Sequence, residues 1–310
     1  MLKKIFIDGS AGTTGLRIAD RLGDRQDIIL IKLPEEKRKD INYRAEAINS
    51  SDITFLCLPD DAAREAVGKT TNPETVIIDT STAHRTLSQW AYGFPELSPE
   101  HEEKIKTSKR IAVPGCHAGG FIALIYPLIE AGILDKSILL SAFSLTGYSG
   151  GGKGMIADYE KNEDPLLKGP RQYGLTQKHK HLPEMKKITS LENEPVFVPV
   201  VGDFYSGMEV TVPLFKKDLK NSKTIEDIKT AYKEKYQGPV VTYVEDFSEG
   251  GFVSAVKLQG KDSMEISVSG NEERILLIAR YDNLGKGASG AAVECMNIVL
   301  GIDKTTGLEL

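Results

Sequence analysis

The strongest constraint on the fold comes from the first 116 residues, where short apolar runs alternate with helical patterns. Residues 3–8, 27–33, 53–59 and 75–81 are predicted strands that are apolar nearly throughout. The helical patterns between them cover residues 13–25, 43–51 and 60–70. Apolar strands that alternate with helices are typical of a parallel sheet covered on both faces. The sequence therefore predicts a doubly wound, Rossmann-type α/β domain.

The pattern changes after one more helix over residues 117–132. Predicted strands separated by loops now follow one another, which favours a largely antiparallel sheet in an α+β domain. They cover residues 137–148, 194–201, 208–215, 239–244, 253–258 and 264–269. A final helix over residues 287–301 is expected to return to the first domain. The predicted domains are residues 1–116 plus 283–310, for nucleotide binding, and residues 117–282, for catalysis and oligomerisation.

Composition excludes several classes of protein. The chain has 310 residues, long enough for two domains, and a net charge of -5 without a long basic run, so no nucleic-acid partner is expected. No signal peptide or membrane span is predicted, and the expected location is the cytoplasm. The three cysteines are Cys57, Cys116 and Cys295. Their odd number and spacing predict neither a disulfide framework nor a metal site.

A glycine-rich turn follows the first predicted strand. IFIDGSAGTTG places Gly9, Gly12 and Gly15 directly before a helix. Such a turn lets backbone N–H groups approach a pyrophosphate at the helix N-terminus, although similar turns occur at any strand–helix junction. The position in a βαβ unit favours nucleotide binding.

The second strand indicates which nucleotide binds. An NAD site usually carries an acidic residue there for the ribose 2′-hydroxyl, whereas this strand ends in Lys32 and is followed by residues 37–39 (KRK). Cations favour a 2′-phosphate and hence NADP(H), although Glu35 and Glu36 lie close by and a solvated charged face is the simpler alternative. The predicted cofactor contacts are Gly9, Ser10, Gly12, Thr13, Thr14, Gly15, Lys32, Ser81 and Asn283.

Cys116 lies between a strand ending in Pro-Gly and a predicted helix. The positive end of a helix dipole lowers the pKa of a thiol and favours the reactive thiolate. A buried cysteine acting as a small apolar residue is the common alternative, and it is the expectation for Cys57 and Cys295.

Six segments in order carry a family resemblance. They are FIDGSAGTTGLRI (6–18), YGFPEL (92–97), VPGCHAGGFIALIYPL (113–128), GYSGGGK (147–153), HKHLPEM (179–185) and DNLGKGASGAAVECMNIVLG (282–301). Together they resemble the shorter form of N-acetyl-gamma-glutamyl-phosphate reductase, of the arginine pathway. The glycine loop departs from the G-x-S-G-x-x-G pattern of longer members, since this chain has G-S-A-G-T-T-G.

The resemblance implies a fold and a reaction. The fold is a Rossmann-type NADP domain with an α+β catalytic domain, as in aspartate-semialdehyde and glyceraldehyde-phosphate dehydrogenases. The reaction is the NADPH-dependent reduction of N-acetyl-L-glutamyl 5-phosphate to the 5-semialdehyde and phosphate. The cysteine of the family's PGC motif falls on Cys116, and family members commonly form homotetramers.

The residues suit covalent chemistry. A Cys116 thiolate can displace phosphate from an acyl phosphate, and the resulting thioester accepts hydride far more readily than a carboxylate does. An acid/base is then needed, and His179 and His181 are the candidates because both lie just before a predicted helix starting near Pro183. Of the two, His181 is preferred. His117 has a weaker claim, because adjacent helical residues do not face each other.

The remaining site predictions concern anion binding. In GYSGGGKG, Ser149, Gly150 and Lys153 are predicted to contact the substrate, with a flexible surface loop as the alternative. Arg85, after the strand 75–80, is a candidate for a substrate carboxylate or phosphate, and an ordinary surface arginine is equally expected. Glu184 either orients an imidazole or favours the helix N-terminus. Asn283 either holds the nicotinamide carboxamide or caps a turn.

Three rival functions fit parts of the sequence. Aspartate-semialdehyde dehydrogenase shares the cysteine–histidine chemistry, and only the HxHxPE and DNLxKG segments argue against it. A catalytically silent nucleotide-binding protein would need no reactive thiol at Cys116. A cysteine hydrolase would leave the glycine loop without a function.

Overall fold

Six parallel strands form the first sheet of the computed structural model, which describes residues 2–161, 163–220 and 222–310. Their order across the sheet is β2-β1-β3-β4-β6-β5. The bounds are β1 (Lys3–Asp8), β2 (Ile28–Ile31), β3 (Ile53–Leu56), β4 (Val76–Asp79), β5 (Ala91–Tyr92) and β6 (Arg110–Ala112). The chain leaves β1 for β2 on one side and later returns to β3 on the other, so the strand order reverses at β1. Sheets of this kind bind ligands beyond the carboxyl ends of the strands at such a point.

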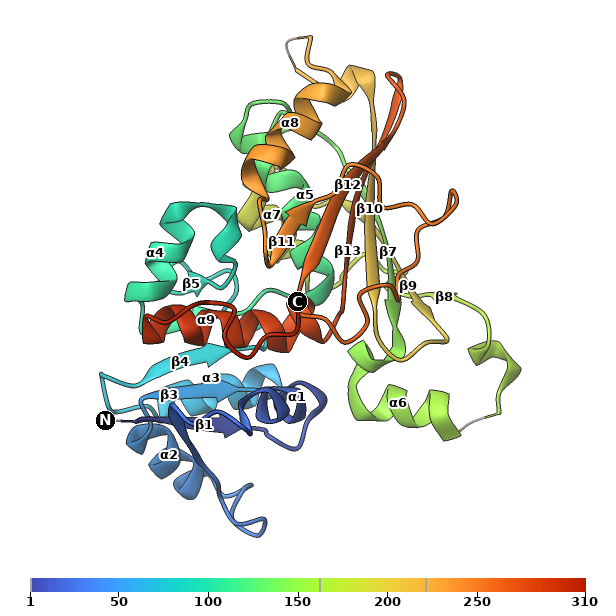
Figure 1. The fold of residues 1–310 in the computed structure, drawn as a ribbon. Helices are drawn as coiled ribbons and strands as arrows, with labels where there is room; N and C mark the ends of the chain where they lie inside the picture. The colour runs from blue at the N-terminus through green and yellow to red at the C-terminus, as the bar shows by residue number, and fades with distance from the viewer. Residues whose placement is uncertain (1, 162, 221) are drawn as a thin grey trace. The chain divides into compact units, whose positions relative to one another are not determined.

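Helices cover both faces of this sheet (Figure 1). The helices are α1 (Thr13–Leu22), α2 (Ile41–Ser50), α3 (Asp60–Gly68), α4 (Pro99–Thr107) and α9 (Gly290–Leu300), with a short 3-10 turn at Pro95–Leu97. Side chains alternate between the faces of a strand. Thus Ile5 of β1 packs with α1, α4 and α9 on one face, whereas Phe6 packs with α2 and α3 on the other. Burial on both faces explains the uninterrupted apolar runs of the sequence.

Gly9, directly after β1, has a conformation that only glycine adopts easily. Its φ is +84°, and a Cβ atom there would lie 2.3 Å from the carbonyl oxygen of Cys57. The turn after β1 can therefore pass closely beside the end of β3 only because residue 9 has no side chain.

Seven strands form the second sheet, in the order β11-β12-β13-β10-β7-β9-β8. Its bounds are β7 (Ser141–Gly147), β8 (Arg171–Gln172), β9 (Val196–Gly202), β10 (Met208–Phe215), β11 (Val241–Tyr243), β12 (Met264–Gly270) and β13 (Arg274–Tyr281). The pairs β11–β12 and β7–β9 are parallel, and the other neighbours are antiparallel. The predicted fold class is therefore confirmed for both sheets.

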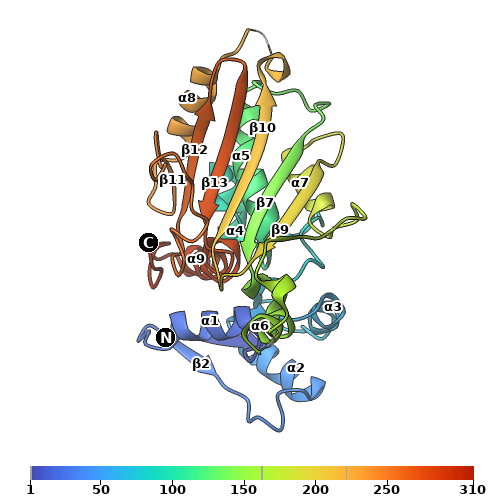
Figure 2. The same ribbon diagram turned by 90° about the vertical axis from the view of Figure 1, so that its right-hand side faces the viewer.

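One face of the second sheet is covered by helices and the other carries exposed apolar side chains. Helices α5 (Cys116–Glu130), α7 (Leu182–Thr189) and α8 (Ile225–Lys235) lie behind the sheet in Figure 2. Helix α6 (Gly152–Lys161) follows a 3-10 turn at Tyr148–Gly151, and further turns are Pro165–Leu167, Lys216–Asp218 and a π-turn at Gly285–Ser289. On the opposite face, exposed apolar side chains include Phe143, Val196, Phe215 and Leu276.

The two sheets belong to separate units. Residues 2–115 and 288–308 make up the first unit, and residues 116–287 with 309–310 make up the second. Helix α9 packs on the first sheet. Residues 283–287, which the sequence analysis assigns to the nucleotide-binding domain, lie in the second unit.

The strand assignment differs from expectation at four places: one predicted strand is wrong, and three strands, β13 and the two-residue β5 and β8, were missed. The predicted strand at 253–258 is wrong, because that segment forms turns, with the N–H of Lys257 bonded to the carbonyl of Ser254. Strand β13 was missed, although it pairs with both β10 and β12. Alternation is a weak signal beside the glycines at 250 and 251, and a strand inside a sheet depends on its neighbours as much as on its own residues.

Candidate functional site

A cavity of about 620 Å³ opens at the carboxyl ends of β1 and β2. Gly9 and Ser10 of the glycine turn line one part of it, and Lys32, directly after β2, lines another. The full lining is Phe6, Ile7, Asp8, Gly9, Ser10, Ala11, Leu16, Ala19, Leu30, Ile31, Lys32, Leu33, Arg38, Lys39, Arg44 and Leu58. The structure thus brings three of the predicted cofactor contacts together on one cavity of the first unit.

Three of the four cations that favour a 2′-phosphate in the sequence line the cavity. Exposed Arg38 and Lys39 join Lys32 on its wall. Arg38 forms an ion pair with Glu35 at 2.9 Å, on the solvent side. Because these cations surround a cavity next to the glycine turn, a phosphate of a bound nucleotide would find charge-assisted partners there.

A buried ion pair lies at the base of the same cavity. The Nε and Nη2 atoms of Arg44, on α2, donate to the two carboxylate oxygens of Asp8, each at 2.9 Å. Burial raises the pKa of the Asp8 carboxyl, and the Arg44 guanidinium opposes that shift. Asp8 is the last residue of β1, so this bidentate pair anchors the start of the glycine turn to α2. No motif in the sequence signals the pair.

The remaining residues of the glycine turn form its backbone frame. The N–H of Gly12 donates to the carbonyl of Gly9 at 2.9 Å, and Thr13 and Thr14 begin α1. A Cβ atom at Gly15 would lie 2.5 Å from the Gly9 carbonyl oxygen. Two of the three glycines are therefore required by close packing alone.

The loop after β4 forms a hydrogen-bonded unit around Asp79. Its carboxylate accepts from the N–H and hydroxyl of Ser81, at 2.9 and 2.7 Å, and contacts Nδ1 of His84 at 2.6 Å. Arg85 is buried and donates to the carbonyls of Val113 and Thr80, both at 2.8 Å. Ser81 does not line the cavity beside Gly9, and Arg85 is not an ordinary surface arginine.

Cys116 begins α5 in the second unit and is partly exposed. The other two cysteines lie in the first unit, and Cys295 is buried in its core. Burial raises the pKa of the Cys57 thiol to about 12. At neutral pH that thiol is therefore protonated and a poor nucleophile.

Three histidine rings cluster around residue 117. The centroid of the His117 ring lies 5.8 Å from that of His179 and 5.6 Å from that of His181. His117 also bonds the hydroxyls of Ser144 and Tyr173, at 2.7 and 2.6 Å. From the sequence, His117 had a weaker claim than the other two histidines, because only its direction relative to Cys116 could be considered. The structure places its ring beside both predicted acid/base residues.

Burial keeps the imidazoles of His117 and His179 neutral near pH 7. It lowers the pKa of His117 to about 3, with His179 as a second cause. The pKa of His179 is also lowered, by burial and by the charge of Lys180. His179 Nδ1 accepts the backbone N–H of His181 at 3.2 Å, so the neutral ring carries its proton on Nε2. His181 is 5% exposed and precedes α7 directly.

Ser149 and Asn283, predicted for substrate and cofactor respectively, bind each other. The Asn283 amide donates to the Ser149 hydroxyl at 3.0 Å and accepts from the N–H of Gly207 at 2.9 Å. Gly150 adjoins this contact, since a Cβ atom there would lie 3.4 Å from the Asn283 nitrogen. Asn283 therefore joins three separate segments, as the alternative of a structural role anticipated.

The other two predicted substrate contacts differ in exposure. Lys153 is exposed near the start of α6 and can meet an anion in solvent. Glu184 is buried in the first turn of α7. A carboxylate in that position also favours the helix electrostatically.

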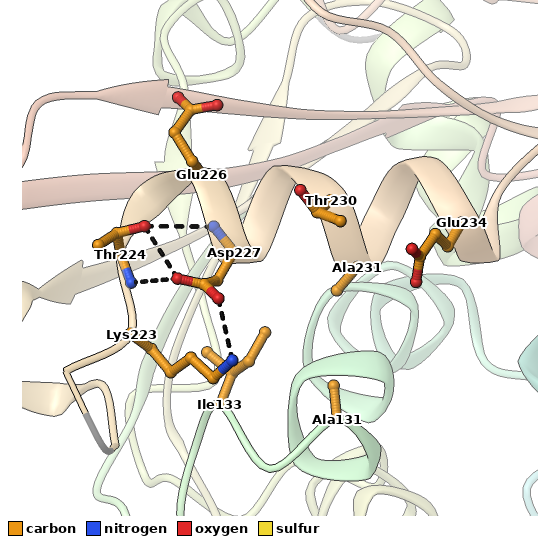
Figure 3. A pocket seen from close by; sticks show the side chains of 9 residues that line it. All are labelled: Ala131, Ile133, Lys223, Thr224, Glu226, Asp227, Thr230, Ala231 and Glu234. Atoms are coloured by element: carbon orange, nitrogen blue, oxygen red, sulfur yellow. Dashed lines mark hydrogen bonds and ion pairs between the residues drawn. The ribbon is translucent and has the colours of Figure 1, made fainter.

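A second cavity, of about 410 Å³, lies between α8 and the end of α5 (Figure 3). Lys223 in its wall is paired with Asp227 at 2.9 Å. The Thr224 hydroxyl caps the helix by accepting the N–H of Asp227, and it donates to the same carboxylate. The pKa of Asp227 is lowered to about 2, first by its bond to Lys223. Glu226 and Glu234 complete a wall that is unsuited to a phosphorylated substrate.

Comparison with known proteins identifies two family models. The model described as "Semialdehyde dehydrogenase, NAD binding domain" matches residues 9–105. The model described as "Semialdehyde dehydrogenase, dimerisation domain" matches residues 116–283.

Curated relatives match over nearly the whole chain. N-acetyl-gamma-glutamyl-phosphate reductase 2 of Nostoc sp. is 44% identical over 98% of this chain and 99% of its own. N-acetyl-gamma-glutamyl-phosphate reductase of Sinorhizobium medicae is 46% identical over 97% of this chain and 99% of its own.

Solved structures share the fold at low sequence identity. Aspartate semialdehyde dehydrogenase II of Vibrio cholerae superposes with a TM-score of 0.75 at 16% identity, over 97% of this chain and 99% of that one. Aspartate semialdehyde dehydrogenase of Candida albicans, solved with NADP, gives a TM-score of 0.69 at 15% identity over the same shares.

The depressed pKa of His117 predicts an acid-dependent loss of stability. The unfolded chain binds a proton at the ordinary histidine pKa near 6.5, whereas folded His117 does so only near 3. Stability due to neutral His117 is thus complete above about pH 6.5 and is lost as the pH falls, at up to about 1.4 kcal/mol per pH unit. We expect His117→Asn to lose less unfolding free energy than the unmodified protein between pH 7.5 and 4.5, in urea titrations.

The control is His101→Asn, which changes a partly exposed histidine of α4 in the other unit. This variant should follow the pH dependence of the unmodified protein. Parallel curves for His117→Asn and the unmodified protein would contradict the prediction.

Proposed function

The chain belongs to the N-acetyl-gamma-glutamyl-phosphate reductase family, and we propose that it reduces N-acetyl-L-glutamyl 5-phosphate to N-acetyl-L-glutamate 5-semialdehyde and phosphate. The identity of 44–46% to reductases over nearly their full length carries this conclusion. The product of such a reaction is an intermediate of arginine biosynthesis. A partly exposed cysteine at a helix start, with histidines in the same unit, supports the chemistry.

Cys116 is the proposed nucleophile. Its thiolate attacks the acyl carbon, a C–S bond forms, and the C–O bond to phosphate breaks with the electron pair leaving on phosphate. The thioester that remains is reduced to a hemithioacetal, which releases the aldehyde and restores the thiolate. When bound, NADPH supplies the hydride for this reduction.

His181 is the proposed acid/base, with His179 as the alternative. Either imidazole can hydrogen-bond the oxyanion of the tetrahedral species and take the hemithioacetal proton in the reverse direction. Burial and the charge of Lys180 lower the pKa of His179, so its imidazole is neutral near pH 7. The preference for His181 rests on its place directly before α7 and its burial beside His117.

The first unit is the proposed site of NADP(H). Gly9 and Ser10 allow close approach of a pyrophosphate, and Lys32, Arg38 and Lys39 suit a 2′-phosphate. The remaining proposed cofactor contacts are Gly12, Thr13, Thr14, Gly15, Ser81 and Asn283. The proposed substrate contacts are Arg85, Ser149, Gly150, Lys153 and Glu184.

The function is tested in the reverse direction. We expect N-acetyl-L-glutamate 5-semialdehyde, phosphate and NADP to give a rise in absorbance of the reduced nicotinamide. Cys116→Ser should lower kcat by on the order of a thousandfold, because the hydroxyl is a far weaker nucleophile without a matching base. Cys295→Ser, a change in the first-unit core, is the matched control.

Aspartate semialdehyde is the competing substrate in the same assay. Turnover of that aldehyde alone would replace the proposed substrate while keeping the chemistry. A folded protein that binds NADPH but turns over neither aldehyde would contradict the proposal.

Cofactor choice gives a residue-level prediction. We expect Lys32→Ala to raise KM for NADP about tenfold or more, because a charge-assisted bond to the 2′-phosphate is lost. KM for NAD, which lacks that phosphate, should stay within about twofold. An equal change for both nucleotides would place the 2′-phosphate elsewhere.

A homotetramer is the proposed assembly. The exposed side chains Phe143, Val196, Phe215 and Leu276 give the second sheet an apolar face of the kind that a second copy covers. We expect light scattering to give four times the mass of 34.0 kDa. Phe143→Glu with Leu276→Glu should reduce that mass, and a monomeric unmodified protein would contradict the proposal.

The proposed location is the cytoplasm. Within the described ranges, every helix is too short or too polar to cross a bilayer. Activity should accompany a cytoplasmic marker when cells are fractionated by osmotic shock, and its release with the periplasmic fraction would exclude this location.

A further inference from the structure

The hydroxyl of Tyr281 bonds both ends of the first turn of α5. It accepts the N–H of Gly120 at 3.1 Å, and it donates to the carbonyl oxygen of Cys116. These two main-chain groups are four residues apart and mark the first hydrogen-bonded turn of a helix. A side chain from β13 thus holds the main chain of the cysteine that begins the helix.

The second glycine of the CHAGG segment makes this contact possible. A Cβ atom at Gly120 would lie 2.5 Å from the Tyr281 hydroxyl and 2.7 Å from a side-chain carbon of Val210. Any other residue at 120 would push Tyr281 away from α5. The glycine is therefore explained by a neighbour 161 positions along the chain.

Tyr281 is itself held firmly. It is fully buried, and β13 pairs it with Met208 of β10 and Met264 of β12. Asp282 follows, and its carboxylate accepts from the Ser206 hydroxyl at 2.7 Å and the N–H of Gly260 at 2.6 Å. The hydroxyl that meets α5 is consequently fixed to the second sheet and its loops.

The segment that follows Tyr281 also approaches the side chain of Cys116. The N–H of Gly287 donates to the carbonyl of Asp282 at 3.0 Å, which turns the chain back toward α5. A Cβ atom at Gly287 would lie 3.1 Å from the Cβ of Cys116. Residues 281–287 therefore contact Cys116 through its carbonyl oxygen and beside its side chain.

We propose that Tyr281 is a positioning residue for Cys116, whose hydroxyl fixes the main chain of the nucleophile and so sets the direction of its thiol. This inference rests on the proposed function, in which Cys116 attacks the substrate. Attack depends steeply on alignment, and a displacement of about 1 Å can cost on the order of a hundredfold in rate. A positioning defect lowers kcat, whereas substrate and cofactor contacts elsewhere keep their strength.

The phenol keeps its proton throughout the working pH range. Burial, and then the charge of a Cys116 thiolate, raises the pKa of Tyr281 well above its ordinary value. The hydroxyl therefore remains a donor to the Cys116 carbonyl whatever the state of the thiol. Loss of this donor is expected only by substitution.

The chain offers a closely matched control on the same helix. Tyr236, directly after α8, and Tyr232 of α8 donate to the carbonyls of Ala123 and Leu124 of α5, at 2.6 and 2.5 Å. The Ala123 carbonyl lacks the usual helical donor because Pro127 has no N–H. Tyr236→Phe thus removes a buried tyrosine–carbonyl bond from α5 about two turns beyond the cysteine.

The test compares Tyr281→Phe with Tyr236→Phe. Measurements are kcat and KM in the reverse reaction, the pH profile of Cys116 alkylation by iodoacetamide, read on its peptide, and the thermal midpoint. We expect Tyr281→Phe to lower kcat about tenfold or more and to displace the alkylation profile, with KM for NADP within about twofold. Tyr236→Phe should lose comparable thermal stability and keep kcat and the profile within about twofold.

Two results would overturn the inference. One is a folded Tyr281→Phe protein with the kcat and alkylation profile of the unmodified protein. The other is an equal loss of kcat in Tyr236→Phe, which would mean that the loss of kcat reflects reduced stability of the fold and not the position of Cys116.

A second variant covers the case in which Tyr281→Phe does not fold. Gly120→Ala places a methyl group against the Tyr281 hydroxyl, displaces it from α5, and should lower kcat and alter alkylation in the same way. Unchanged values for that variant would then overturn the inference. Failure of the proposed function is distinguished separately, since an inactive unmodified protein, or an active Cys116→Ser protein, would count against the nucleophile itself.

Discussion

Hydrogen bonds between tyrosine hydroxyls and the main chain of α5 are the interactions on which the second unit depends. Nearly every residue of α5 is buried, so its polar main-chain groups cannot turn to water. Pro127 leaves the carbonyl of Ala123 without a helical donor, and Tyr236 supplies one. Tyr281 likewise donates to the carbonyl of Cys116, at the start of the helix. The position of the Cys116 thiol therefore follows from how this helix is held.

The absence of a side chain at two glycines is as important for the position of these segments as the hydrogen bonds are. Gly9 lets the nucleotide turn pass the carbonyl of Cys57, and Gly120 lets the Tyr281 hydroxyl reach the first turn of α5. The first glycine was expected to let the backbone approach a pyrophosphate, whereas its close approach to Cys57 was not predicted. The second belonged to a motif whose purpose was invisible, because the group that fills its space comes from β13. Both places combine a tight contact with a predicted ligand or nucleophile site.

Two histidines of the cluster could be predicted from the sequence, but their partners could not. His179 and His181 stand out because they share a short segment before a predicted helix. Their partners His117, Ser144 and Tyr173 come from α5, β7 and the loop after β8, and no spacing relates them. Strand β13 was missed for a similar reason, since its pairing with β10 and β12 makes it a strand. The cation-lined cavity was predicted only in part. Lys32 was expected as a cofactor contact, whereas the Asp8–Arg44 ion pair that lines the same cavity was not predicted.

The sequence by itself determined the parallel first sheet, the mostly antiparallel second sheet, the glycine turn and the cysteine at a helix start. These features follow from local periodicity and from motifs of a few residues, which act within one element or one turn. The tertiary structure alone decided that Tyr281 holds Cys116 across 165 positions of the chain, and that His117 joins the other two histidines. Such contacts depend on the register of strands and the packing of helices, which are settled only when the whole core is buried.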